Sequence, residues 1–252
     1  MLTVERGLRV LRAFRSDRVP LSNADLVRRT GLSKATVSRL TSTLLNLGLI
    51  RRVPDGRKLE LSAGPLAVGH AYLATNELVQ VAHPVMQSLA DALDVSVAFG
   101  IRDGMDMLYV GYRVSAKVAT LRLGVGTVLP MGVTAMGHAY LWALPPAERD
   151  HLLQQILHAA AGNAARTEKS IRNSFAQLDE TGVCGVVSEY QRKVYALAAP
   201  ASIGRKHTLM GLSCGNADFS QSFSKAKKRI VPELKQAVVQ LETLLADYDG
   251  PP

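Results

Sequence analysis

Between positions 33 and 39 the chain carries two cationic and three hydroxyl side chains among small residues. Side chains of these types donate hydrogen bonds to phosphate oxygens and to base-pair edges in the major groove of DNA. A pair of adjacent cations, Arg57 and Lys58, follows in a later turn. This chemistry predicts a surface that contacts double-stranded DNA. The predicted contact residues are Ser33, Lys34, Ala35, Thr36, Ser38, Arg39, Arg57 and Lys58.

The distribution of charge indicates a polyanionic partner for the same segment. Residues 1–62 hold 13 Lys and Arg against 5 Asp and Glu, a net charge of +8, out of +9 for the whole chain. Residues 63–252 are almost neutral. Such asymmetry is typical of segments that bind nucleic acid or an anionic membrane surface. The cations are spread over several predicted elements instead of one amphipathic helix, which favours DNA.

The spacing of apolar residues shows which elements must position these cations. Residues 4–15 have one apolar face and predict a helix. Gly31 suits the left-handed conformation that ends a helix, and Ser33 is a suitable cap for the next one. Residues 54–57 predict the turn of a short hairpin. Short helices followed by a basic hairpin predict a winged helix-turn-helix domain over residues 1–62.

The rest of the chain predicts a linker and a larger second domain. Residues 63–77 carry no charge before Glu77 and predict a packed linker helix. Over residues 78–252 helical and strand patterns alternate, which predicts an antiparallel sheet with helices on one face and an α+β fold class. The predicted helices are 78–93, 133–143, 146–158, 168–181 and 224–248, and the predicted strands are 95–101, 106–113, 121–123, 183–190, 194–201 and 208–214.

Several stretches of the chain resemble the IclR family of one-component bacterial transcription regulators. They are VERGLRVLRAF at 4–14, RTGLSKATVSRLTSTLLNLGLIRR at 29–52, LPMGVTAMGHAYLWALPPAE at 129–148, LAAP at 197–200 and GLSCG at 211–215. The resemblance covers almost the whole chain. It implies a repressor or activator that acts as a homodimer, often paired into tetramers, with residues 78–252 forming a GAF-like α/β effector-binding domain. A two-fold dimer in turn predicts a pseudopalindromic operator.

The run at 131–137 is the predicted centre of the effector site. It begins a helix after a strand-like segment, and free N–H groups at a helix start bind anions such as a carboxylate. In the family that the chain resembles, backbone near the positions matching Ala135 and Met136 holds the carboxylate of the effector. A small organic acid is therefore the expected ligand.

The side chains expected around this acid depart from the family pattern. Val186, Ala196 and Gly215 stand where an acid, a Cys and a Ser are common, and only Ser213 keeps a hydroxyl. These replacements predict a pocket that is more hydrophobic than the family pattern, which favours an aromatic or longer-chain carboxylate. The orientation of Glu189, inward or outward, is left open by the sequence. The predicted effector-binding residues are Leu121, Leu129, Ala135, Met136, Val186, Glu189, Ala196, Ser213 and Gly215.

Other classes of function have less support. The sequence contains no HExxH, CxxC or GxSxG motif, so we expect no enzyme activity, no metal and no cofactor. One alternative is a redox sensor that uses Cys184 and Cys214, which requires reactive thiols close together. A second alternative is a DNA-binding regulator without a small-molecule effector. The chain lacks a secretory signal and an apolar run of about 18 residues, so we expect a cytoplasmic protein that does not enter the membrane.

Overall fold

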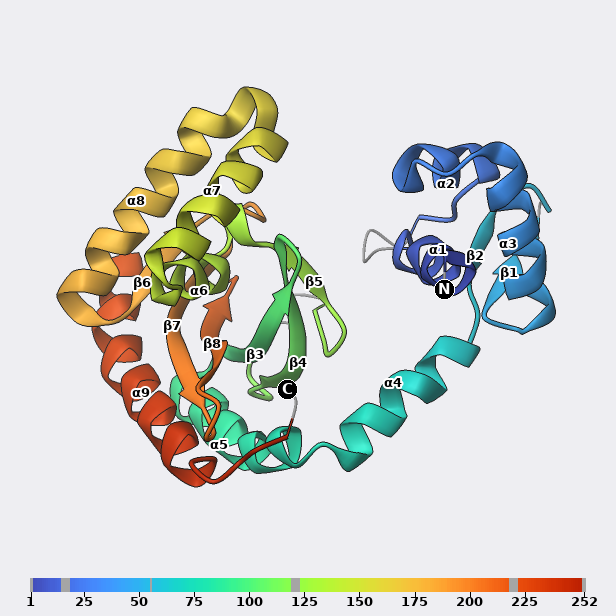
Figure 1. Ribbon diagram of the computed structural model, residues 1–252. Coiled ribbons are helices and arrows are strands. Elements are labelled where there is room, and N and C mark those ends of the chain that lie inside the picture. The colour runs from blue at the N-terminus through green and yellow to red at the C-terminus, as the bar shows by residue number, and fades with distance from the viewer. Residues whose placement is uncertain (1, 15–18, 55, 119–122, 218–221, 251–252) are drawn as a thin grey trace. The chain divides into compact units, whose positions relative to one another are not determined.

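The computed structural model describes residues 2–14, 19–54, 56–118, 123–217 and 222–250 of the chain. The chain divides into two compact units, Met1–Thr75 and Asn76–Pro252 (Figure 1). This division lies two residues before the predicted end of the linker at residue 77.

The first unit combines short helices with a two-stranded hairpin. One apolar core joins α1, α2, α3 and both strands, with Val10, Leu26, Val37, Ile50 and Leu59 among its buried members. The predicted winged helix-turn-helix is confirmed. The elements are α1 (Leu2–Arg12), α2 (Asn23–Thr30), α3 (Lys34–Asn46), β1 (Ile50–Arg52), β2 (Leu59–Leu61) and α4 (Gly64–Thr75).

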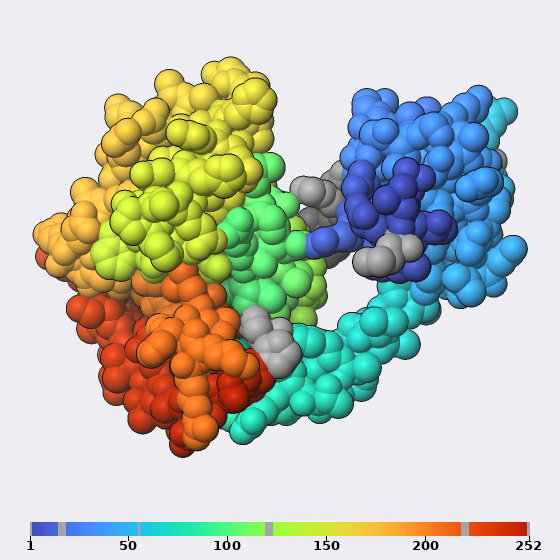
Figure 2. Space-filling view, viewed as in Figure 1, coloured from blue at the N-terminus to red at the C-terminus, as the bar shows by residue number. Residues whose placement is uncertain are grey.

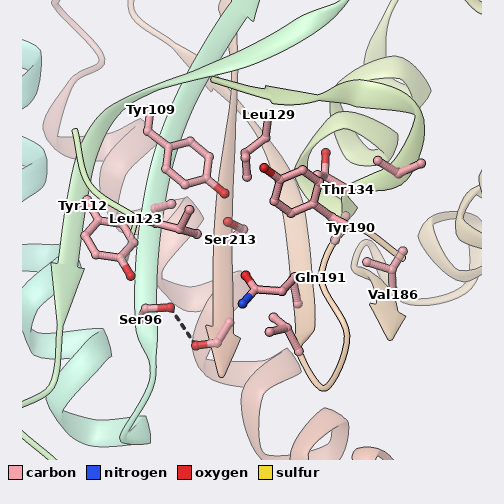
Figure 3. A pocket seen from close by; sticks show the side chains of 16 residues that line it. Ser96, Tyr109, Tyr112, Leu123, Leu129, Thr134, Val186, Tyr190, Gln191 and Ser213 are labelled. Atoms are coloured by element: carbon pink, nitrogen blue, oxygen red, sulfur yellow. Dashed lines mark hydrogen bonds between the residues drawn. The ribbon is translucent and has the colours of Figure 1, made fainter. Parts of the chain in front are cut away.

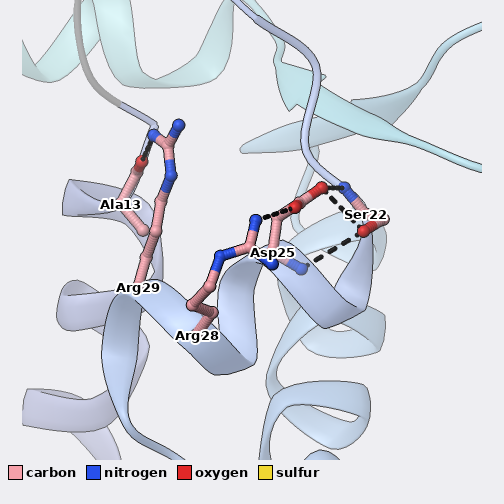
Figure 4. A network of polar contacts seen from close by, with 5 residues as sticks. All are labelled: Ala13, Ser22, Asp25, Arg28 and Arg29. Atoms are coloured by element: carbon pink, nitrogen blue, oxygen red, sulfur yellow. Dashed lines mark hydrogen bonds and ion pairs between the residues drawn. The ribbon is translucent and has the colours of Figure 1, made fainter.

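Local sequence explains the two helices of the helix-turn-helix. At the start of α2 the Ser22 hydroxyl accepts the Asp25 amide, and the Asp25 carboxylate accepts the Ser22 amide (Figure 4). Gly31 follows α2 at φ 68°, a conformation that glycine adopts without strain. Ser33 then caps α3 by accepting the Thr36 amide. The short turn fixes how α3 projects from the domain.

The second unit contains a six-stranded antiparallel sheet in the order β5-β4-β3-β8-β7-β6. The mixed helix and sheet architecture confirms the predicted fold class. Its strands are β3 (Ser96–Asp103), β4 (Asp106–Val114), β5 (Val128–Pro130), β6 (Cys184–Val187), β7 (Tyr195–Ile203) and β8 (Thr208–Asn216). Its helices are α5 (Glu77–Leu93), η1 (Met131–Val133), α6 (Ala135–Ala143), α7 (Pro146–Ala160), η2 (Ala161–Asn163), α8 (Ala164–Thr181) and α9 (Phe223–Leu244).

Helices cover both faces of this sheet, so the prediction of helices on one face is wrong. On one face the Phe223 ring of α9 fills the space beside Gly185. On the other face the Cys184 thiol donates to the Ala135 carbonyl at 3.3 Å, which places α6 against that face. Adjacent residues of one strand thus meet different helices, as the alternation of side chains along a strand requires.

Three local details differ from the predicted elements. The helix predicted at 133–143 is divided by Thr134, whose extended backbone separates η1 from α6. The strand predicted at 183–190 ends at Val187, because Ser188 turns the chain with φ 55°. The helix predicted at 224–248 ends at Leu244, and Pro232 lies inside it without ending it. The strand predicted at 121–123 falls largely on residues 119–122, outside the described ones.

Candidate functional site

Helix α3 presents most of the predicted DNA contacts on one side. Val37, Thr41 and Leu44 form its buried side. Lys34 lies in the first turn and Arg39 lies on the side away from these residues, and neither side chain forms an ion pair or hydrogen bond with any residue that the structure describes. Their charges are therefore available to an external anion. The exposed members of the predicted set on α3 are Ser33, Lys34, Ala35, Ser38 and Arg39, and Thr36 is half-buried.

The start of α3 offers backbone donors as well. The Ser33 hydroxyl caps the helix by accepting the Thr36 amide, and it lies 3.0 Å from the Thr36 hydroxyl. The amides of Lys34 and Ala35, in the first turn, have no carbonyl partner within the helix. A phosphate placed there would meet two N–H donors and the positive end of the helix.

Not every arginine of this unit is free to contact DNA. Arg28 pairs with Asp25, and Arg29 donates to the Ala13 carbonyl at 2.9 Å, which ties α2 to the end of α1 (Figure 4). The hydroxyl and amide of Ser22, helped by Arg28, lower the pKa of Asp25 to about 2. These residues stabilise the domain rather than extend the α3 surface.

The hairpin carries the remaining predicted contacts. Arg57 and Lys58 are both exposed. Arg51 is engaged by Glu60, with a nitrogen–oxygen distance of 2.8 Å. The ammonium of Lys58 meets no described acceptor, so this side chain is available for a backbone phosphate.

A pocket lies in the second unit, on the face of the sheet that α6 covers (Figure 3). Its volume, measured as the space open to the centre of a water molecule, is about 60 Å³. Among the described residues that line it, none is charged, and the polar side chains are hydroxyls and one amide. Six predicted effector-binding residues line it: Leu129, Ala135, Val186, Ala196, Ser213 and Gly215.

Three other predicted residues have different positions. Leu121 lies outside the described residues. The Met136 side chain does not line the pocket, because it fills the space above Gly100 and Gly211 in the sheet. Glu189 does not line it either, because its carboxylate pairs with Arg166 at 3.5 Å.

Sequence reasoning missed the largest polar groups of the pocket. Tyr109 and Tyr112 are three residues apart, and regular alternation would place them on opposite faces of the sheet. In the structure Phe99 pairs with Gly111 but Gly100 pairs with Tyr109, so Val110 is an extra residue in β4. This β-bulge turns both rings to the pocket face. Val133 and Thr134 lie in the run 131–137, the predicted centre of the site, but were not named individually, and the residues missed altogether are Ser96, Ala98, Tyr109, Tyr112, Leu123, Tyr190, Gln191 and Val194.

The hydroxyls of these tyrosines differ in their surroundings. Burial raises the pKa of Tyr109, and the neighbouring Ser213 hydroxyl offsets part of the shift. Burial also raises the pKa of Tyr112. The Tyr112 hydroxyl is buried and forms no hydrogen bond within the described part of the chain. Ser96 directs its own proton to the Gly215 carbonyl, at 2.8 Å.

The start of α6 forms another wall of the pocket. Thr134 caps the helix by accepting the Gly137 amide at 3.2 Å, and its hydroxyl donates to the Pro130 carbonyl at 2.9 Å. The amides of Ala135 and Met136 have no carbonyl partner within the helix. The structure therefore places a capped helix start, with two unused N–H groups, beside a neutral pocket.

The two cysteines lie on opposite faces of the sheet. Cys184 pairs with Ala198, which pairs with Ser213, so all three share a face, whereas Cys214 is the next residue along β8. Both thiols are buried, and burial raises the pKa of each to about 12. A disulfide between them is incompatible with this geometry, so the redox alternative based on this pair is not supported.

Apolar side chains are exposed on the first unit. Leu2, Val4 and Leu8 of α1 are more than half exposed. Helix α4, whose surface is visible in Figure 2, has no buried residue and no charge. Its Leu66 and Val68 are 73% and 72% exposed. The expectation that the linker helix packs is thus not met within a single chain. Exposed apolar patches of this kind are typical of interfaces.

Comparisons with known proteins agree with this architecture. Residues 3–54 match the IclR helix-turn-helix domain, and residues 70–243 match the bacterial transcriptional regulator IclR C-terminal domain. The crystal structure of an IclR family transcriptional regulator from Brucella abortus is 31% identical, with a TM-score of 0.87, and the alignment covers 97% of this chain and 92% of that one.

Two further relatives are informative. The Pca regulon regulatory protein of Pseudomonas putida is 28% identical over 239 residues, 94% of this chain and 81% of that protein. An IclR homologue from Microbacterium hydrocarbonoxydans, solved in complex with 4-hydroxybenzoate, is 18% identical with a TM-score of 0.65, over 96% of this chain and 98% of that one. In the described part of the chain no helix is long and apolar enough to cross a membrane.

Proposed function

The chain belongs to the IclR family of bacterial transcription regulators, and from this premise we propose that a small organic acid, bound in the second unit, modulates its binding to an operator. The observation that carries the proposal is the neutral pocket beside the start of α6. The proteins that the chain resembles are regulators, and we propose a binding protein without enzyme activity that acts in the cytoplasm.

The DNA-binding half of the proposal rests on α3 and the hairpin. Lys34 and Arg39 are exposed cations whose side chains no described residue engages, on the helix that such motifs insert into the major groove. Arg39 would read a base edge, Lys34 and the first-turn amides would hold phosphates, and Lys58 would hold a phosphate beside the hairpin.

The effector half rests on the size and chemistry of the pocket. A volume of about 60 Å³ holds about four to six waters, which corresponds to one aromatic ring with an acid group. The amides of Ala135 and Met136 would bind the carboxylate, and Leu123, Leu129 and Val186 would contact the ring. The solved relative with 4-hydroxybenzoate supports an aromatic acid as the ligand class.

The assembly that we propose is a homodimer, with a tetramer formed by pairing of dimers. The exposed apolar side chains of α1 and α4 support a second copy of the chain as the partner of these helices, because exposed apolar side chains are poorly solvated and α4 carries no charge at all. A two-fold dimer would present two copies of α3 to a pseudopalindromic operator.

The proposal is tested by measuring DNA affinity with and without an acid. Sequences selected from random DNA by the full chain are labelled, and fluorescence anisotropy gives Kd in the presence and absence of 4-hydroxybenzoate. We expect tight sequence-specific binding that changes at least several-fold with the acid. Specific binding that no aromatic or aliphatic carboxylate alters supports a regulator without an effector instead.

A matched pair of variants separates specific contacts from net charge. The double variant Lys34→Ala, Arg39→Ala removes two charges from α3, and Lys228→Ala, Arg229→Ala removes two exposed charges from α9. Only the first should abolish specific binding. Equal losses in both would contradict the assignment of α3 as the DNA-reading helix.

A further inference from the structure

The proposed binding of a carboxylate at α6 leaves the far side of the pocket unexplained. Tyr112 and Ser96 lie across the pocket from Thr134, which caps α6 (Figure 3). These two hydroxyls come from neighbouring strands, β4 and β3, and Tyr112 reaches the pocket through the bulge at Val110. A ligand held by its carboxylate at α6 would direct its other end toward them.

The hydrogen bonds that already exist at this far side determine which further bonds a ligand can form there. The Ser96 proton is committed to the Gly215 carbonyl at 2.8 Å, so the Ser96 oxygen can only accept. The Tyr112 hydroxyl has no partner within the described residues although it is buried. Buried polar groups are nearly always satisfied, so this hydroxyl is available to a partner that a ligand in the pocket supplies. That partner must accept a hydrogen bond from the Tyr112 hydroxyl. It binds more strongly if it also donates a hydrogen bond to the oxygen of Tyr112 or Ser96.

Because no described residue that lines the pocket is charged, the far side favours a neutral ligand group over a second carboxylate. A second carboxylate at the far side would be buried without a cation among the described lining residues and away from the start of α6. Burial of an unpaired charge is strongly unfavourable. A neutral hydroxyl accepts and donates, and it carries no such penalty.

We propose that Tyr112 is a specificity-determining residue, and that it selects a single-ring aromatic monocarboxylate with a hydroxyl at the end remote from the acid. This inference rests on the proposed effector function and names its substrate class. The carboxylate provides the anchor at α6, and the Tyr112 hydroxyl discriminates between rings that share this anchor. A site built to hydrogen-bond a ligand hydroxyl discriminates against the analogue that lacks it.

The test is isothermal titration calorimetry of the full chain with benzoate, 4-hydroxybenzoate and terephthalate. For the unmodified protein we expect 4-hydroxybenzoate to bind about 10-fold more tightly than benzoate, and terephthalate to bind more weakly than either. In Tyr112→Phe the preference for the hydroxylated ring should fall to within about two-fold, with benzoate affinity preserved. Tyr140→Phe, which removes a hydroxyl from α6 outside the pocket, should keep the preference.

The outcomes separate this inference from the proposal on which it rests. If the three acids bind without discrimination, or if the preference survives in Tyr112→Phe, the role of Tyr112 is overturned and the effector function stands. If none of the three acids binds, the ligand class named here is overturned, and the operator-binding assay with other carboxylates decides the effector function separately. Removal of an unpartnered hydroxyl should leave the melting temperature of the ligand-free chain unchanged or higher, which shows that any loss of preference is not a loss of folding.

Discussion

Nδ1 of His138 lies 2.8 Å from the Ser174 hydroxyl, and its Nε2 lies 3.1 Å from the Gly132 carbonyl. A carbonyl only accepts, so Nε2 carries the proton and Nδ1 accepts from Ser174. The ring is fully buried, and burial lowers its pKa to about 4. A neutral histidine thus joins α8 to the segment that leads into α6.

The first prediction is that this histidine makes the protein less stable in mild acid. Its pKa of about 4 in the folded state, against 6.5 for an unburied histidine, means that protonation favours the unfolded chain. Its contribution is complete above pH 6.5 and is lost as the pH falls toward 4, by up to about 3 kcal/mol. Urea denaturation across this range measures it.

Two variants isolate the effect. His138→Gln should be less stable at neutral pH and should lose less stability on acidification. His158→Gln removes an exposed histidine and should follow the unmodified protein. An unchanged pH dependence in His138→Gln would assign the acid sensitivity to other groups.

The second prediction concerns Arg39. Its replacement by alanine should weaken specific operator binding by about 1–3 kcal/mol and relax the preference at one base pair of each half-site. The measurement is a competition assay with single-base operator variants. Arg229→Ala, on α9, is the control, and loss of affinity without any change in base preference would make Arg39 a phosphate contact.

The third prediction concerns Lys58 of the hairpin. Because its ammonium is exposed and meets no described acceptor, Lys58→Ala should weaken binding to all sequences alike. The slope of log Kd against log salt should decrease by about 1 for each operator half-site contacted. Lys228→Ala should leave the slope unchanged, and a similar change in both would point to a general charge effect.

The fourth prediction concerns Gly137 in the first turn of α6. A Cβ atom there would overlap the backbone of Met131, which cannot move aside as a flexible side chain would. Gly137→Ala should destabilise the second unit by about 3 kcal/mol. Gly162→Ala is the control because no atom lies near its Cβ position. Thermal unfolding of the two variants should differ clearly, and equal melting temperatures would contradict the close approach.

Much of the fold could be predicted from the sequence because local signals agree with it. The predicted helix at 78–93 is α5 to within one residue, since Asn76 caps it and its apolar face is regular. Gly31 and Ser33 define the turn of the helix-turn-helix. The second helical layer was not predicted, because buried helices such as α6 are apolar all round and carry no directional pattern.

The pocket was predicted in part, because sequence motifs indicate some of its residues whereas others depend on contacts between distant segments. Ala196 and Gly215 pair across β7 and β8, and both belong to positions that the family resemblance indicated. Tyr112 was missed because its orientation depends on how β4 pairs with β3, which is a long-range property. Met136 was assigned to the pocket because its place at the helix start was clear, whereas the direction of its side chain depends on Gly100 and Gly211.

The extra residue Val110 gives the proposed effector pocket an unusual route to new ligands. Deletion of that one codon would restore regular pairing between β3 and β4, and one of the two tyrosines would then turn to the opposite face of the sheet. Substitutions change a binding site one side chain at a time, but a single-residue deletion here would exchange an aromatic wall in one step. In efforts to retune the regulator as a biosensor, β4 is therefore the strand in which length, and not only composition, should be varied.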